Sequence, residues 1–184
     1  APEEWFAHHP LQDIQLPDTI DTDRADLPRY SKDLTTLQHV APTHEWMTES
    51  GEWKHAVQSY LASVTFADYC VGKVLDALAA SSHADNTIIV LFSDHGFHLG
   101  EKERWAKRTL WEDGTRVPLI IHDPRQKSAP NRKSSANPST PSTTNAPVGL
   151  IDIYPTLLDL TGLKPDSIHE GHSPTPLLHN PSAK

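Results

Sequence analysis

Residues 87–92 read Thr-Ile-Ile-Val-Leu-Phe, and residues 93–101 continue as Ser-Asp-His-Gly-Phe-His-Leu-Gly-Glu. The first six are β-prone and uncharged, which predicts a strand buried on both faces, as in a parallel sheet covered by helices. The next nine bring an acid and an imidazole directly after that strand. In open parallel sheets, ligands bind beyond the carboxyl ends of the strands. This stretch therefore predicts both the fold class and the place of an active site.

The segments on either side of this strand support an α/β fold. From Trp53 to Ala80, apolar residues recur at steps of three and four, which predicts a helix of about seven turns with Ser50 as its N-cap. A helical patch is expected over 107–113 and a second short strand over 117–121, where Pro118 favours a sheet edge or a strand's first residues. Together these elements predict a mostly parallel central sheet covered by helices.

The remainder of the chain divides by composition. Residues 1–49 are interrupted by five prolines and are expected to be an irregular wrapping segment. Residues 50–124 form the helix-strand core. Residues 125–147 contain only Ala as an apolar residue besides Pro, and they are expected to be a low-complexity insertion. Residues 148–184 are expected to form a short helix, with Pro155 in its first turn and Gly162 ending it, and a Pro-rich tail.

Composition excludes several classes of protein. The 184 residues include 16 Lys and Arg against 24 Asp and Glu, a net charge of −8. That balance disfavours a protein that coats nucleic acid. No apolar run reaches the length of about 18 residues that a membrane-spanning helix needs. The single cysteine excludes an internal disulfide and a multi-thiolate zinc site.

The candidate site begins with Asp94 and His95. Gly96 and Gly100 allow the chain to turn, so a carboxylate and an imidazole can converge on one divalent cation, a hard one such as calcium or magnesium. The same residues could instead form only a turn. Lys107, twelve residues on, could place its ammonium as a point charge against an anionic group, or it could be a surface lysine.

A resemblance to a known family covers roughly Trp53 to Leu178. Its motifs are SYLASVTFADYCVGKVLDAL, SDHGFHLGEK-ERWAKRTLWEDGTRVPLII, LIDIYPTLLDLTGL and EGHSPTPLL. In this order they resemble the sulfatase family, nearest its iduronate-2-sulfatase and choline-sulfatase-like branch. The resemblance implies an alkaline-phosphatase-like sandwich, of which this chain is the C-terminal part of the catalytic domain.

The resemblance also implies roles for individual residues. Asp94 and His95 match the second pair of metal ligands, usually for one Ca²⁺. Lys107 matches the lysine that contacts the sulfate group and stabilises charge on the departing oxygen. His98 is expected to line the substrate pocket. The implied partner is a sulfated small molecule or sulfated sugar, and the implied compartment is secretory, lysosomal or periplasmic.

Sulfatases use a formylglycine made from a Cys or Ser in a Cys/Ser-x-Pro/Ala-x-Arg signature. We expect that nucleophile region to be absent, so that the 184 residues are inactive alone. Cys70 lies on the apolar stretch of the long helix and is expected to be a buried structural thiol. Three alternatives stay open: a phosphoester or phosphonate hydrolase of the same superfamily, a non-catalytic module that binds an anion or a partner, and a plain structural domain.

Overall fold

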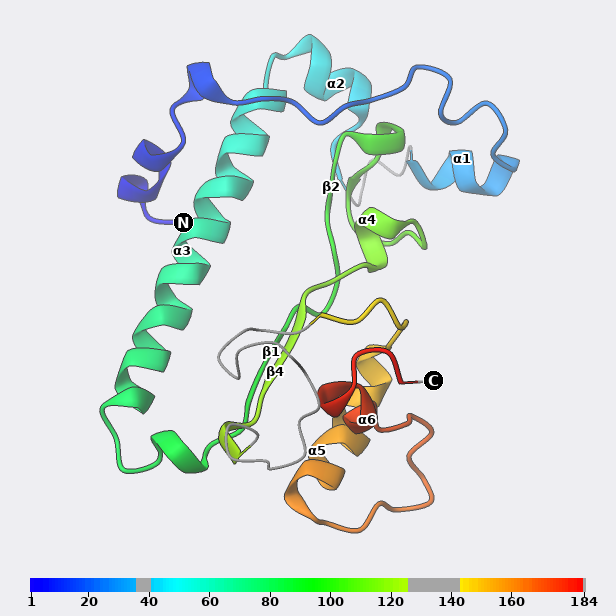
Figure 1. Ribbon diagram of the computed structural model, residues 1–184. Coiled ribbons are helices and arrows are strands. Elements are labelled where there is room, and N and C mark those ends of the chain that lie inside the picture. The colour runs from blue at the N-terminus through cyan, green and yellow to red at the C-terminus, as the bar shows by residue number, and fades with distance from the viewer. Residues whose placement is uncertain (36–40, 126–142, 184) are drawn as a thin grey trace. The chain divides into compact units, whose positions relative to one another are not determined.

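The computed structural model describes residues 1–35, 41–125 and 143–183, and these form two compact units (Figure 1). The first comprises Ala1–Ala84 and His95–Leu119, and the second comprises Asp85–Asp94 and Ile120–Lys184. Helices and strands occur in both, which confirms the α/β class. Most of the predicted insertion, 126–142, lies outside the described residues.

In chain order, the first unit contains the following helices, 3₁₀ helices (η) and strands: η1 (Glu3–His8), η2 (Leu11–Asp13), α1 (Arg29–Thr35), α2 (His44–Glu49), α3 (Trp53–Ala79), β2 (His98–Leu99), η4 (Glu101–Glu103), β3 (Trp105–Ala106) and α4 (Glu112–Thr115). The second contains β1 (Ile89–Phe92), η6 (Leu150–Asp152), α5 (Ile153–Thr161) and α6 (Thr175–His179), and the boundary between the units falls within η3 (Ala84–Asn86) and within β4 (Leu119–His122).

Helix α3 confirms the prediction from apolar periodicity to within one residue at its end. Its N-cap is Glu52, whereas Ser50 ends the preceding helix α2. The cap was mispredicted because α2 occupies 44–49, so the residues before Trp53 form the link between two helices.

Within the described residues, no helix combines the length and apolar character needed to cross a membrane.

The N-terminal segment packs along α3 and is more ordered than the irregular chain we predicted. The Trp5 ring lies 4.9 Å from the Tyr69 ring, and the Gln58 side chain donates to the His9 carbonyl at 2.8 Å. Prolines did not prevent structure, because Pro2 and Pro10 lie at the N-caps of η1 and η2, where a missing N–H costs little.

The expectation that Cys70 is a buried structural thiol was wrong. Its thiol is exposed, as are the apolar side chains of Val64 and Val74 on the same helix. Apolar spacing placed Cys70 on a helix correctly. Burial requires a neighbouring layer at that position, which spacing alone does not reveal.

The predicted strands are both present, but their burial differs from the prediction. β1 and β4 form a two-stranded sheet, and Pro118 lies directly before β4, where it removes no ladder hydrogen bond. Leu91 is 39% exposed and Phe92 is 47% exposed. The prediction that this strand is buried on both faces was therefore wrong for Leu91 and Phe92. The expected larger sheet would have had helices over both faces, and a sheet of two strands lacks that cover at these residues.

The predicted helical patch over 107–113 is also wrong. Lys107 to Leu110 form a loop between β3 and α4, and only the last part of the patch is helical. The backbone of Ala106 and Arg108 is left-handed, with φ of 63° and 73°. That conformation interrupts a right-handed helix at this point.

Helix α5 follows the prediction closely. Pro155 lies in the first turn of α5, and Gly162 ends the helix with φ of 73°. The tail folds back onto the start of this helix, because the Asp152 carboxylate accepts from the backbone N–H of Gly149 and of His172, each at 2.8 Å. These two hydrogen bonds lower the pKa of Asp152.

Candidate functional site

The boundary between the two units falls between Asp94 and His95, so the two residues belong to different units. Asp94 is exposed and follows β1 after a single residue, Ser93. His95 is half-buried and begins the loop that leads to β2. Both residues therefore follow the strand as the sequence predicted.

Gly96 fixes the turn that follows His95. Its N–H donates to the Gly114 carbonyl at 2.9 Å. A Cβ at this position would lie 2.0 Å from the carbonyl oxygen of Asp113. Because no side chain fits there, the two backbone segments can approach closely only with glycine at 96.

Lys107 and His95 meet, as the candidate site requires. The Lys107 Nζ lies 2.5 Å from His95 Nε2, and His95 Nδ1 lies 2.8 Å from the Gly96 carbonyl oxygen. A carbonyl can only accept, so Nδ1 carries the proton and Nε2 presents its lone pair to the ammonium.

In this tautomer, His95 has the form of a metal ligand. The Nε2 lone pair is the group that would coordinate a cation, and here it accepts from an ammonium, which is itself a cation. Across residues 1–35, 41–125 and 143–183, no group of three or more His, Cys, Asp or Glu side chains could hold a metal ion. The unprotonated Nε2 of His95 therefore suits a metal ligand, and a divalent cation bound there would need further ligands.

Strands β2 and β3 form the antiparallel hairpin that carries Lys107. Its register pairs His98 with Ala106 and Leu99 with Trp105. The Trp53 indole N–H donates to the Leu99 carbonyl at 2.7 Å, so helix α3 anchors the hairpin from outside.

The hairpin's backbone is unusual. Four residues that are not glycine have left-handed φ values between 53° and 73°: Lys102, Glu103, Ala106 and Arg108. Each costs about 1–2 kcal/mol, so the surrounding contacts must hold them in place. Such strain is concentrated at functional sites more often than elsewhere.

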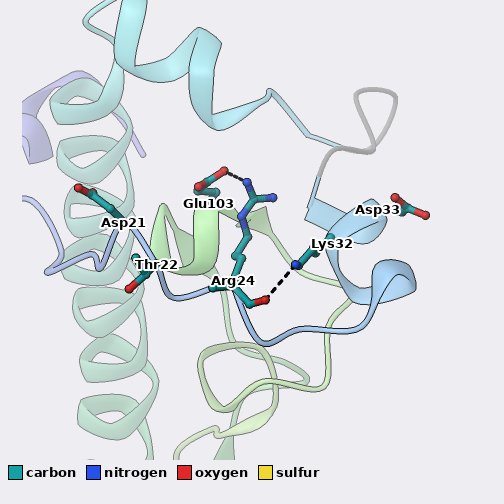
Figure 2. Close-up of a pocket in the computed structure, with 7 residues that line it drawn as sticks. Asp21, Thr22, Arg24, Lys32, Asp33 and Glu103 are labelled. Atoms are coloured by element: carbon teal, nitrogen blue, oxygen red, sulfur yellow. Dashed lines mark hydrogen bonds and ion pairs between the residues drawn. The ribbon is translucent and has the colours of Figure 1, made fainter.

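A polar pocket beside this hairpin is lined by one of the left-handed residues, Glu103 (Figure 2). Arg24 forms an ion pair with Glu103, and Lys102 Nζ lies 2.7 Å from Asp23 Oδ1. Its lining residues are Asp21, Thr22, Arg24, Ala25, Lys32, Asp33 and Glu103. Arg24 also donates to Thr35 and Lys32 to the Ala25 carbonyl, so the pocket's cations bind groups of the chain itself.

Arg104 is a residue that the sequence did not single out. It is 1% exposed, and its Nη2 donates to the Lys107 carbonyl at 2.7 Å. Burial lowers its pKa, and nearby Arg108 lowers it further. Only its position between Trp105 and the charged turn hinted at this role, and most arginines in such turns are exposed.

His98 faces the interior of the first unit. Its side chain is fully buried, and Nε2 lies 2.7 Å from Thr109 Oγ1. The nearest carboxylate, that of Asp113, lies 3.9 Å from the other ring nitrogen, beyond hydrogen-bond range. His98 thus underlies the Lys107 loop, and its expected contact with substrate stays a prediction.

His98 gives a testable pH dependence. Burial lowers its pKa, and the Asp113 carboxylate opposes that shift only in part. The folded protein therefore favours the neutral ring, so stability is complete above the unfolded pKa of about 6.5 and falls as pH decreases through it. We expect His98→Asn to remove up to about 1.4 kcal/mol per pH unit from the slope of unfolding free energy between pH 7 and 5. Urea unfolding at several pH values measures this, and an unchanged slope contradicts it.

One stretch bears on the expected absence of a nucleophile. Ser128-Ala-Pro-Asn-Arg132 has the spacing of the formylglycine signature, so the pattern does occur in the chain. It lies in the Ser- and Pro-rich tract, outside the described residues, and follows Asp94 in sequence. A five-residue match in a tract of that composition arises readily by chance, and the absence of a working nucleophile stays a prediction.

Comparison with known proteins identifies sulfatases by family model and by individual relatives. The family model described as Sulfatase matches residues 17–163. A sulfatase of Formosa agariphila is 44% identical over 94% of this chain and 32% of its own length. The mouse iduronate 2-sulfatase (Mus musculus) is 40% identical over 58% of this chain and 22% of its own length. The chain therefore spans about a third of the first relative and less of the second.

Solved structures show the same fold. An enzyme in complex with its substrate D-glucosamine-2-N,6-O-disulfate is 36% identical, with a TM-score of 0.60, over 71% of this chain and 24% of the other. A phosphonate monoester hydrolase from Silicibacter pomeroyi is 26% identical, with a TM-score of 0.75, over 97% of this chain and 34% of the other.

Proposed function

Because the chain belongs to the sulfatase family, we propose that its protein hydrolyses a sulfuric ester and that Asp94, His95 and Lys107 form part of the active site. One observation carries the proposal: the Lys107 ammonium meets the His95 lone pair, 12 residues apart, just beyond β1. A sulfuryl group is stabilised by positive charge. The Lys107 ammonium supplies such a charge directly, and the His95 nitrogen, which follows a strand, would supply it through a bound metal ion.

Each residue has a distinct task. Asp94 and His95 would hold one divalent cation, for which we propose Ca²⁺, and that ion would supply positive charge to the sulfuryl oxygens. Lys107 contributes a compact charge that binds the sulfate group and stabilises the oxygen that departs with the alcohol. His98, under the loop, keeps Thr109 and the segment after Lys107 in place.

We expect the nucleophile to come from a part of the protein outside these 184 residues. We therefore expect the 184 residues alone to show no turnover of 4-nitrophenyl sulfate. Mass spectrometry of the tryptic peptides checks the one signature-like stretch, because conversion of Ser128 to formylglycine removes two hydrogens. Turnover by the isolated chain, or an oxidised Ser128, would contradict this expectation.

Removal of Asp94 tests the metal part of the proposal. In the full-length protein, we expect Asp94→Ala to weaken calcium binding at least about 100-fold, because loss of an outer-shell partner alone costs about 10–100-fold. Calorimetric titration with Ca²⁺ and metal analysis of the purified protein measure the effect. Asp68→Ala, an exposed carboxylate on α3, is the matched control and should bind calcium normally. Equal affinity in both variants would reduce Asp94 to a turn residue.

A phosphonate or phosphate ester is the second candidate substrate, favoured by the fold shared with the phosphonate monoester hydrolase. Lys107 as a point charge suits either anion, so kcat/KM for matched sulfate, phosphate and phosphonate esters of 4-nitrophenol decides between them. We expect the sulfate ester to be preferred. Binding of all three without turnover in the full-length protein would identify an anion-binding module.

The relatives support a proposal for the substrate class. One solved relative binds a disulfated glucosamine, and others are named for sulfated sugars or choline sulfate. We propose that the substrate of this protein is a sulfated sugar. We also propose that the protein acts in a secretory, lysosomal or periplasmic compartment. A panel of sulfated monosaccharides, assayed by release of inorganic sulfate, tests that choice.

A further inference from the structure

We propose that Arg104 is a positioning residue, which holds the Lys107 turn so that the ammonium points at His95 and at the sulfate. The inference rests on the proposed function, in which Lys107 binds the sulfate group. It concerns a residue that does not itself touch substrate. Its basis is the hydrogen bond of 2.7 Å from Arg104 Nη2 to the Lys107 carbonyl oxygen.

The backbone around Lys107 needs such an anchor. Strand pairing ends at Ala106, which is opposite His98, so Lys107 is the first residue beyond the ladder. Ala106 and Arg108, on either side of it, are both left-handed without being glycine. A turn of this kind relaxes to ordinary φ values unless its surroundings determine it. The Arg104 guanidinium reaches from inside the hairpin to the carbonyl between the two strained residues.

The burial of Arg104 argues against a filling role. It is among the three largest fully buried side chains of the described residues, and burial works against its charge. An apolar side chain of similar volume would fill the same space without the cost of removing a charge from water. A buried guanidinium is therefore explained better by the hydrogen bond that it makes than by the volume that it occupies.

Arg104→Met in the full-length protein separates the two roles. If the side chain only fills space, Met should be tolerated and sulfate binding should be unchanged. If it positions Lys107, the variant should fold, yet bind inorganic sulfate about tenfold more weakly and lose about 100-fold in kcat, since a misplacement of 1 Å can cost that much. Calorimetry with sulfate alone gives the binding readout, and circular dichroism confirms folding. Arg116→Met, an exposed arginine paired with Glu112, is the matched control and should stay within about twofold of wild type.

A rescue experiment tests the strain directly. Glycine adopts left-handed φ values without steric cost, so Ala106→Gly with Arg108→Gly should restore part of the sulfate affinity lost in Arg104→Met. A residue that merely stabilised the core would not be rescued by glycines in a loop. Should Arg104→Met fail to fold, Arg104→Lys decides, because it keeps the charge but not the planar fork, and we expect at least tenfold weaker sulfate binding.

Lys107→Met distinguishes failure of this inference from failure of the proposed function. If Lys107→Met weakens sulfate binding but folded Arg104→Met, or Arg104→Lys in its place, does not, the positioning role is overturned and the function stands. If Lys107→Met itself binds sulfate normally, the proposed function fails, and the inference fails with it.

Discussion

Lys107→Met should reduce kcat for a sulfate ester by about 10²–10³-fold in the full-length protein, the range seen when one group that stabilises developing charge is removed. Methionine keeps most of the length of the side chain and removes only the ammonium. The loss should fall mainly on kcat, because charge on the departing oxygen develops in the transition state. Steady-state kinetics with 4-nitrophenyl sulfate, or with the preferred sulfated sugar, measures it.

The control for this prediction is a second exposed lysine in the same unit. Lys54 lies in the first turn of α3, and Lys54→Met makes the same chemical change there. It should leave kcat within about twofold, as expected for a surface charge. If Lys107→Met kept a third or more of wild-type activity, Lys107 would be an ordinary surface residue after all.

Gly96→Ala is expected to have the largest effect on stability, a loss of about 3 kcal/mol in the free energy of unfolding. The added methyl would lie 2.0 Å from the Asp113 carbonyl oxygen, which is backbone and cannot rotate away. Relief requires the segments around 96 and 114 to separate, which breaks the hydrogen bond between them. Chemical denaturation of the full-length protein measures the loss.

The same substitution at Gly72 gives a control with the opposite sign. Gly72 lies in the interior of α3, and a Cβ there meets nothing within 4 Å. Gly72→Ala should therefore stabilise the helix by roughly 0.5–1 kcal/mol through helix propensity. If both variants were equally stable, the close approach at Gly96 would not exist in solution.

Several elements could be predicted because their signal is local. The spacing of apolar residues defines α3, the run of uncharged β-prone residues defines β1, and Gly162 marks the end of α5. Each signal acts within a few turns or a few residues of the element that it forms. The resemblance of the motifs to sulfatases is local in the same sense, and the family match confirms it.

Other features depended on contacts between distant residues. Cys70 is exposed because burial depends on what packs against α3. Residues 107–110 are not helical, because the backbone of Ala106 and Arg108 is left-handed. The ion pairs that hold Lys102 and Glu103 come from Asp23 and Arg24, about eighty residues earlier. No pattern of spacing reports such a pairing.

The sequence by itself determined the class of fold, the long helix, the strand and the identity of Asp94, His95 and Lys107 as candidates, since periodicity and motif order are written along the chain. Only the tertiary structure decided that Lys107 meets His95, that His98 is buried and that Arg104 holds the turn. The reason is physical: hydrogen bonds and burial depend on distances in space, and a hairpin with four strained residues exists only where the contacts around it offset its cost.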